Sequence, residues 1–168
     1  MKRVLALIII LAIATPTLLV AAKDEVMTGG TLQNMPMQGL TGAPKFISEF
    51  RGKPLIINVW ASYCSPCLDE MGSLERLWQR YGDQFNIIGI SIDDYRERAD
   101  KFLMQAETTF PHYIDQRLML EKMLGARTIP LTVLIDSQSR VLKKVNGARE
   151  WDSPEIIELI GRTYDIDL

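Results

Sequence analysis

The apolar run LIINVW at residues 55–60 limits the fold of this chain more than any other feature. It follows the turn-forming segment RGKP and leads almost directly into two cysteines. A nearly continuous apolar run bounded by turn residues is typical of a strand that is buried on both faces of a sheet. Such a strand needs helices above and below it, so the run predicts an α/β domain.

Strand and helix patterns alternate through the rest of the chain. Short antiparallel strands are expected within residues 31–50, in the segments TLQNMPMQGL and FISEF. After the cysteines, the pattern predicts a helix that ends at Tyr81-Gly82 and then a strand at 85–92. A helix from Asp94 to about Gln105 should follow, with Asp94 and Glu97 as its capping box. The remaining expected elements are a helix at 117–124, a hairpin of LTVLID and VLKKVNG, and a helix opened by Ser153. This order predicts a mixed central sheet flanked by helices, with a short N-terminal β extension.

The N-terminus predicts export. Lys2 and Arg3 precede an uncharged run at residues 4–22 that ends in the small residues Ala21-Ala22, which is the pattern of a signal peptide. The run is also long enough to span a bilayer as a membrane anchor, and a buried core helix is the remaining interpretation. In either exported form, the two cations keep the N-terminus cytoplasmic. The expected organisation is a signal peptide or membrane anchor at 1–22, a linker at 23–30 and a single domain at 31–168.

The composition excludes several classes of protein. With 47% hydrophobic and 24% charged residues, the chain matches a soluble globular domain and not a fibrous or disordered one. A formal net charge of −2 provides no basic excess to neutralise phosphate groups. Nucleic acid is therefore not expected as a partner.

The chain's 2 cysteines, Cys64 and Cys67, allow three interpretations. A purely structural disulfide would close a very short loop, for which chain entropy gives only about 1.9 kcal/mol. A zinc site needs more ligands than two thiols, and apart from carboxylates the chain offers only His112. No metal is expected, although carboxylates could complete such a site. The third interpretation is a redox-active pair, whose disulfide opens and closes.

The position of the pair favours the redox interpretation. The cysteines follow a buried strand and open a helix, with Ser65-Pro66 in its first turn. Cys64 is expected at or beside the N-cap, where free N–H groups and the helix dipole lower the pKa of a thiol. Cys67 faces the same side but lies inside the helix and is more covered. One thiol can then attack a substrate while the other resolves the mixed disulfide.

The stretch PLIINVWASYCSPCLDEM resembles the active-site segment of exported thioredoxin-fold proteins of the TlpA/ResA type. The segments FRGK, TIP, LTVLID and VNG extend the resemblance over nearly all of the chain after residue 30. It implies a thioredoxin-like fold and a thiol-disulfide oxidoreductase, often a reductant that serves cytochrome c maturation or other periplasmic thiols. It also implies Cys64 as the nucleophile, Cys67 as the resolving thiol, Glu70 as a buried acid and Pro130 as a cis-proline. No cofactor is expected.

Proton control departs from the general thioredoxin pattern. Asn58 stands where thioredoxins carry a buried aspartate, and Glu70 supplies a carboxylate from the helix, as in the ResA type. An acid buried near Cys67 would have a raised pKa and could hold or accept the thiol proton. Asp69 and Glu70 are adjacent, so one of them should face solvent. Glu70 is expected to be the inward one.

A substrate surface is expected around the disulfide. Base rates favour a trans bond at Pro130, but the resemblance implies a cis Ile129-Pro130 bond. The N–H and C=O of Ile129 would then be exposed for strand-like pairing with a substrate. Trp60 and Tyr63 are expected to shape the surface around Cys64, with a core position as the alternative for Trp60. Other candidate residues are expected to be structural and to have no part in this surface. They are His112, interpreted as a structural histidine, and four methionines interpreted as core residues, Met71, Met104, Met119 and Met123.

The leading functional hypothesis is a periplasmic thiol-disulfide oxidoreductase that reduces disulfides in specific exported proteins. Its expected partners are protein thiols and disulfides, together with a membrane electron-donor protein. The second hypothesis is a thiol oxidase that donates its disulfide to exported proteins. The third is a copper-handling binding module of thioredoxin fold, which stoichiometric Cu(I) binding without insulin reduction would select.

Overall fold

The computed structural model describes residues 25–168, and the expected export segment at 1–22 lies outside them. A 7-stranded sheet crosses this part of the chain in the order β2-β1-β5-β4-β3-β6-β7. The strands are β1 (Pro36–Gly39), β2 (Lys45–Phe46), β3 (Leu55–Trp60), β4 (Asn86–Ser91), β5 (His112–Ile114), β6 (Leu131–Ile135) and β7 (Val141–Asn146). The helices are α1 (Ser65–Tyr81), α2 (Arg96–Ala106), α3 (Met119–Leu124) and α4 (Pro154–Tyr164), with a short 3-10 helix, η1 (Ile47–Phe50).

Strand β3 lies inside the sheet, between β4 and β6. It pairs in parallel with β4 and antiparallel with β6, and all of its residues are buried. The sheet continues in parallel from β4 to β5, whereas β1, β2 and β7 are joined by antiparallel pairing. The predicted mixed sheet with an N-terminal β extension is confirmed.

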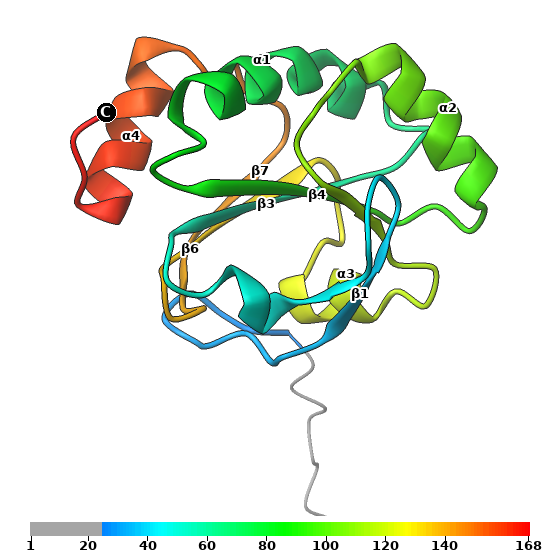
Figure 1. Cartoon of the computed structure of the whole chain (residues 1–168), viewed down its shortest axis with the longest axis horizontal. Coiled ribbons are helices and arrows are strands. Elements are labelled where there is room, and N and C mark those ends of the chain that lie inside the picture. Colours follow the sequence, from blue (N-terminus) through cyan, green and yellow to red (C-terminus); the bar gives the residue numbers. More distant parts are fainter. Residues whose placement is uncertain (1–24) are drawn as a thin grey trace, which may run out of the picture.

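Helices cover both faces of the sheet. In Figure 1, α1, α2 and α4 lie on one side, and α3 lies on the other together with the N-terminal segment. Each side encloses its own apolar cluster: Ile56 and Trp60 of β3 belong to the first, and Ile57 and Val59 belong to the second. Because successive residues of a strand face opposite sides, β3 must be apolar along nearly its whole length.

Three details of the elements differ from the prediction. Tyr95 is the N-cap of α2 and makes no side-chain capping bond, so Asp94 lies one residue too early to open a capping box. The segment FISEF contributes only Phe46 to a strand, because residues 47–50 form η1. Strand β5 has 3 residues, and its sequence carries no periodic pattern that would reveal it.

The methionine assignment is half correct. Met71 and Met123 are buried, whereas Met104 and Met119 are 71% and 50% exposed. Met104 lies on the solvent side of α2, and Met119 is the first residue of α3. A three-to-four spacing on short helices is therefore a weak sign of burial here.

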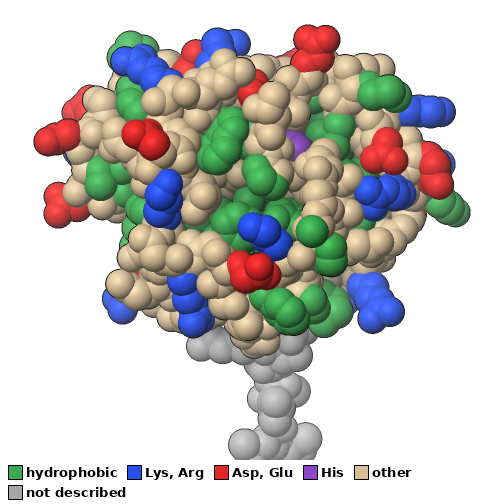
Figure 2. Space-filling view, viewed as in Figure 1, with side chains coloured by type: hydrophobic (Ala, Val, Ile, Leu, Met, Phe, Trp, Pro, Cys, Tyr) green, Lys and Arg blue, Asp and Glu red, His purple; other side chains and the backbone are tan. Residues whose placement is uncertain are grey.

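The surface mixes charges of both signs. Figure 2 shows acidic and basic side chains interspersed over one face, without a continuous basic area. Within residues 25–168, the helices are too short or too polar to cross a membrane.

Candidate active site

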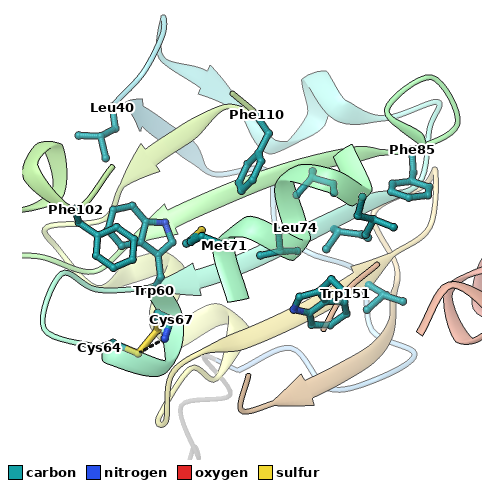
Figure 3. Packing of buried hydrophobic residues seen from close by; sticks show 14 of the residues in the cluster. Leu40, Trp60, Cys64, Cys67, Met71, Leu74, Phe85, Phe102, Phe110 and Trp151 are labelled. Atoms are coloured by element: carbon teal, nitrogen blue, oxygen red, sulfur yellow. Dashed lines mark hydrogen bonds between the residues drawn. A yellow bond between two sulfur atoms is a disulfide. The ribbon is translucent and has the colours of Figure 1, made fainter. Parts of the chain in front are cut away.

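The candidate active site begins where β3 leads into α1. Cys64 and Cys67 form a disulfide there, and Figure 3 shows it at the start of the helix. Cys64 is the N-cap of α1, with proline in the first turn. Cys64 is 7% exposed, whereas Cys67 is fully buried. The predicted N-cap position and the greater covering of Cys67 are confirmed.

The N-cap position prepares Cys64 to ionise. The backbone N–H of Cys67 donates a hydrogen bond to Cys64 Sγ over 3.2 Å. Once the disulfide is reduced, this N–H and the positive end of the α1 dipole stabilise a thiolate on Cys64. Ser65 and Pro66, between the cysteines, add no charge to this environment.

Asp93 fixes the loop that leads into Cys64. Its carboxylate accepts hydrogen bonds from the backbone N–H and the hydroxyl of Ser62, over 2.9 and 2.6 Å. Ser91 Oγ donates to the same carboxylate over 2.8 Å. Hydrogen bonds of Asp93 thus connect the end of β4 to the loop that carries Cys64. Sequence reasoning missed Asp93, although the carboxyl ends of parallel strands are where functional side chains collect in α/β sheets.

Glu70 is buried on the inner face of α1. It is 1% exposed, whereas Asp69 faces solvent, so the prediction that Glu70 is the inward acid is confirmed. Asn58 Nδ2 donates to Glu70 Oε1 over 2.7 Å. The indole N–H of Trp151 and the backbone N–H of Arg149 donate to Oε2 over 2.9 and 3.1 Å. Three N–H donors therefore hold the carboxylate.

Two effects oppose each other at this carboxyl. Burial raises the pKa of Glu70 above its ordinary value, while the N–H donors and the positive charge of Arg149 partly counter that increase. The bonded neighbours are all donors, so they favour the ionised form. The result is a water-excluded carboxylate that can take up a proton more readily than a solvated one.

Trp151 is the partner of Glu70 that sequence reasoning missed. It is fully buried, and 81 positions separate it from Glu70 in the chain. Figure 3 shows it in the same buried cluster as Met71 and Leu74 of α1. Its one sequence signal is a large aromatic residue within the polar segment GAREWDSP.

The loop before β6 lies beside the cysteine loop. The Ile129–Pro130 peptide bond is cis, as the family resemblance implies. Val59 of β3 pairs with Leu131 of β6, so Pro130 sits next to the end of β3. Tyr63, which is 72% exposed, and Ile129 line one surface hollow of about 560 Å³. The structure therefore brings Tyr63, Ile129 and Pro130 together near the disulfide.

Trp60 lies in the core and not on the surface around Cys64. It is fully buried and stacks on Phe102, with ring centroids 4.3 Å apart. Its indole N–H donates to His112 Nδ1 over 3.2 Å. The expectation of a surface role for Trp60 is wrong, because strand alternation turns this residue toward the helix layer. Its core alternative is the position observed.

His112 has the structural surroundings that the sequence predicts. Its Nε2 lies 2.9 Å from Thr108 Oγ1, and its other ring nitrogen accepts the Trp60 bond. Burial lowers the pKa of His112 to about 3, so the ring is neutral at physiological pH. Within residues 25–168, no group of three or more His, Cys, Asp or Glu side chains is arranged to hold a metal ion.

Comparison with protein families and sequences gives consistent results. The Redoxin family model matches residues 23–160. The thiol-disulfide oxidoreductase ResA of Geobacillus thermodenitrificans is 29% identical over 126 residues, which cover 74% of this chain and 72% of that protein. ResA of Halalkalibacterium halodurans is 29% identical over 142 residues, which cover 83% of this chain and 81% of the relative.

Solved structures share the fold. A Chlorobium tepidum protein assigned as a thiol:disulfide interchange protein DsbE superposes with a TM-score of 0.75 at 24% identity, covering 82% of this chain and 98% of that one. A secreted Mycobacterium tuberculosis disulfide oxidoreductase, homologous to E. coli DsbE, superposes with a TM-score of 0.64 at 21% identity. That match covers 77% of this chain and 94% of the other. The predicted thioredoxin-like fold is confirmed.

The fold and the disulfide together define a thioredoxin-like protein with a redox-active CxxC pair. The chain belongs to the Redoxin family. Within this family it is a thiol-disulfide oxidoreductase, and it is similar to the ResA proteins. The predicted family and enzymatic activity are confirmed.

Proposed function

We propose that the protein reduces disulfide bonds in specific exported proteins in the periplasm. The observation that carries this proposal is the asymmetry of the disulfide: Cys64 is the N-cap and accepts an N–H bond, whereas Cys67 is fully covered. A stabilised, reachable thiolate with a covered partner is suited to attack a substrate disulfide. The uncharged Ser65-Pro66 pair favours the reducing direction, because no cation stabilises the thiolate further.

In the proposed cycle, the dithiol form gives a pair of electrons to the substrate. The Cys64 thiolate attacks one sulfur of the substrate disulfide, whose S–S bond breaks as a mixed disulfide forms and a substrate thiolate leaves. Cys67 then loses its proton and attacks Cys64 Sγ, which releases the second substrate thiolate. The Cys64–Cys67 disulfide seen in the structure is the oxidised form that ends this cycle.

Glu70 is proposed to accept the proton of Cys67. The two residues are separated by about one helical turn and are both buried on α1. A buried carboxyl with a raised pKa is a suitable general base and acid for a thiol in the same apolar layer. The resolving thiol has no solvent contact of its own, which makes an internal acceptor useful.

Tyr63, Ile129 and Pro130 are proposed to form the substrate-binding surface. Tyr63 and Ile129 line the same hollow beside the cysteine loop, and Pro130 follows directly. An extended substrate segment could add to the backbone at Ile129 in a strand-like manner. Trp60 would contribute only indirectly, by packing beneath this region.

The site of action is proposed from the N-terminal sequence. A signal peptide or anchor at 1–22, followed by a linker at 23–30, would deliver the domain at 31–168 to the periplasm. The related M. tuberculosis oxidoreductase is a secreted protein, which supports export. Since the periplasm is kept oxidising, a reductase there needs a membrane electron-donor protein. Protein thiols of cytochrome c maturation are the substrate class that the ResA resemblance suggests.

Trapping of mixed disulfides tests the division of labour between the cysteines. Cys67→Ser should accumulate mixed disulfides with substrates, because Cys64 still attacks but nothing resolves the product. Cys64→Ser should trap none, because Cys67 is fully covered. Non-reducing electrophoresis of cells that express each variant measures the difference. Equal trapping by the two variants would contradict the assignment.

A further inference from the structure

Trp151 lies in the segment 149–152, which contacts α1 on successive turns of the helix. The backbone N–H of Trp151 donates to Ser73 Oγ over 3.0 Å. Arg76 forms an ion pair with Asp152 over 2.6 Å. Glu70, Ser73 and Arg76 follow one another at a spacing that keeps them on one side of the helix. The segment is therefore held against α1 beside the Glu70 carboxylate.

The hydrogen bonds at this carboxylate are unequal. Oε2 accepts two of them, from the Trp151 indole and from the Arg149 backbone, whereas Oε1 accepts one, from Asn58. A carboxylate oxygen has about two lone-pair positions, so Oε2 is filled and Oε1 keeps one position free. We propose that Trp151 is a positioning residue for Glu70, whose indole N–H occupies Oε2 so that a proton is received at Oε1.

This inference rests on the proposed role of Glu70 as the proton acceptor of Cys67. Trp151 would then act on disulfide exchange through Glu70, without touching the thiols or the substrate. Loss of its N–H should leave the ionised carboxylate less well stabilised, since a bond to a charged group is among the strong ones. Exchange would consequently need a higher pH.

Few other groups near Glu70 could change the pH at which its carboxyl ionises. Asn58 and Thr132, which extend the hydrogen-bonded chain into the sheet, are uncharged. The charged groups around the carboxyl and residues 149–152 are Arg149 after β7, and Glu150 and Asp152, which are both paired with Arg76 of α1. Cys67 lies about one helical turn from Glu70 on α1, and it does not titrate while it is in the disulfide. None of these is removed when Trp151 alone is changed.

The direct test is to titrate Glu70 by ¹³C NMR in the oxidised protein, in which no thiol titrates. Trp151→Phe removes the N–H and keeps most of the ring, so we expect the Glu70 midpoint to rise by about one to two pH units. Trp78→Phe is the matched control, because it makes the same change at a partly buried tryptophan of α1, the helix that carries Glu70. This control should leave the midpoint unchanged.

The second readout is the pH profile of disulfide exchange in the reduced protein. Trp151→Phe should shift this pH profile upward by the same amount as the NMR midpoint. In a protein that already carries Glu70→Gln, adding Trp151→Phe should leave the profile unchanged. If the NMR midpoint moves but the exchange profile does not, the positioning role stands and the proposed base role of Glu70 fails. An unmoved midpoint would overturn the positioning role. Should Trp151→Phe not fold, benzothienylalanine at position 151 replaces the N–H by sulfur at constant shape and is judged by the same outcomes.

Discussion

The side chain proposed to govern proton exchange in this site is Glu70. It is almost completely removed from water, and no cationic side chain is bonded to it within residues 25–168. Its pKa is raised mainly by desolvation, and neutral N–H donors recover only part of the hydration that is lost. Such a carboxyl takes up a proton more readily than a solvated one, which suits the proposed role as proton acceptor for Cys67.

Glu70→Gln should keep the fold and slow disulfide exchange by about 100-fold, because a glutamine cannot accept the thiol proton. The slowing should be greatest near neutral pH and should lessen in alkaline solution, where a larger fraction of the Cys67 thiol is ionised without an internal proton acceptor. Stopped-flow reduction of a model disulfide as a function of pH measures this. Exchange rates that match the unaltered protein at every pH would return Glu70 to a structural role.

Among the elements, the long ones follow from local patterns. Strand β3 is apolar on both faces and α1 combines an N-cap, a proline and an apolar stripe, so both were predictable from residues 55–81. Helical spacing also reveals that Cys67 and Glu70 share the inner face of α1. These three signals are local, and they account for the correctly predicted part of the candidate site.

The remaining features depend on contacts between distant segments. Strand β5 has 3 residues and exists because β1 and β4 flank it. The bond from Trp151 to Glu70 depends on where the chain runs after β7, which no short pattern encodes. Asp93 and Ser62 also meet only through the neighbouring ends of β3 and β4. The hollow lined by Tyr63 and Ile129 is likewise a product of the whole fold.

His112 of β5 is buried against Trp60 of β3, and its burial should make the stability of the protein depend on pH. Its pKa is lowered from 6.5 to about 3 in the folded protein, so between these values the unfolded chain binds more protons. Stability is then complete above about pH 6.5 and falls as pH drops, by up to about 1.4 kcal/mol per pH unit. Urea unfolding over this range measures the slope.

His112→Gln is the control for this prediction, because it removes the titrating ring and can still accept the Trp60 N–H bond. The raised pKa of Glu70 acts in the opposite direction, since stability from that group is lost as pH rises. The difference between the two proteins therefore isolates His112. Equal slopes in both would show that His112 is not held neutral by burial.

At the scale of the whole molecule, the direction of electron flow depends on the reduction potential. Thioredoxin-fold enzymes span about −270 to −120 mV, a range equivalent to about 7 kcal/mol for a two-electron couple. In this protein the Cys64 thiolate is supported by a helix N-terminus and one N–H bond, with no charge between the cysteines. An ionised Glu70 would disfavour a nearby thiolate further. Both features predict a potential near the reducing end.

The redox state of Cys64 and Cys67 inside cells tests the proposed reductase most directly. Cells that express the full chain are quenched in acid, the free thiols are alkylated, and the two forms are separated by their change in mass. A predominantly dithiol form is predicted, because an electron donor must keep a periplasmic reductase reduced. A predominantly disulfide form, together with a measured potential near about −120 mV, would contradict the reductase and identify a thiol oxidase.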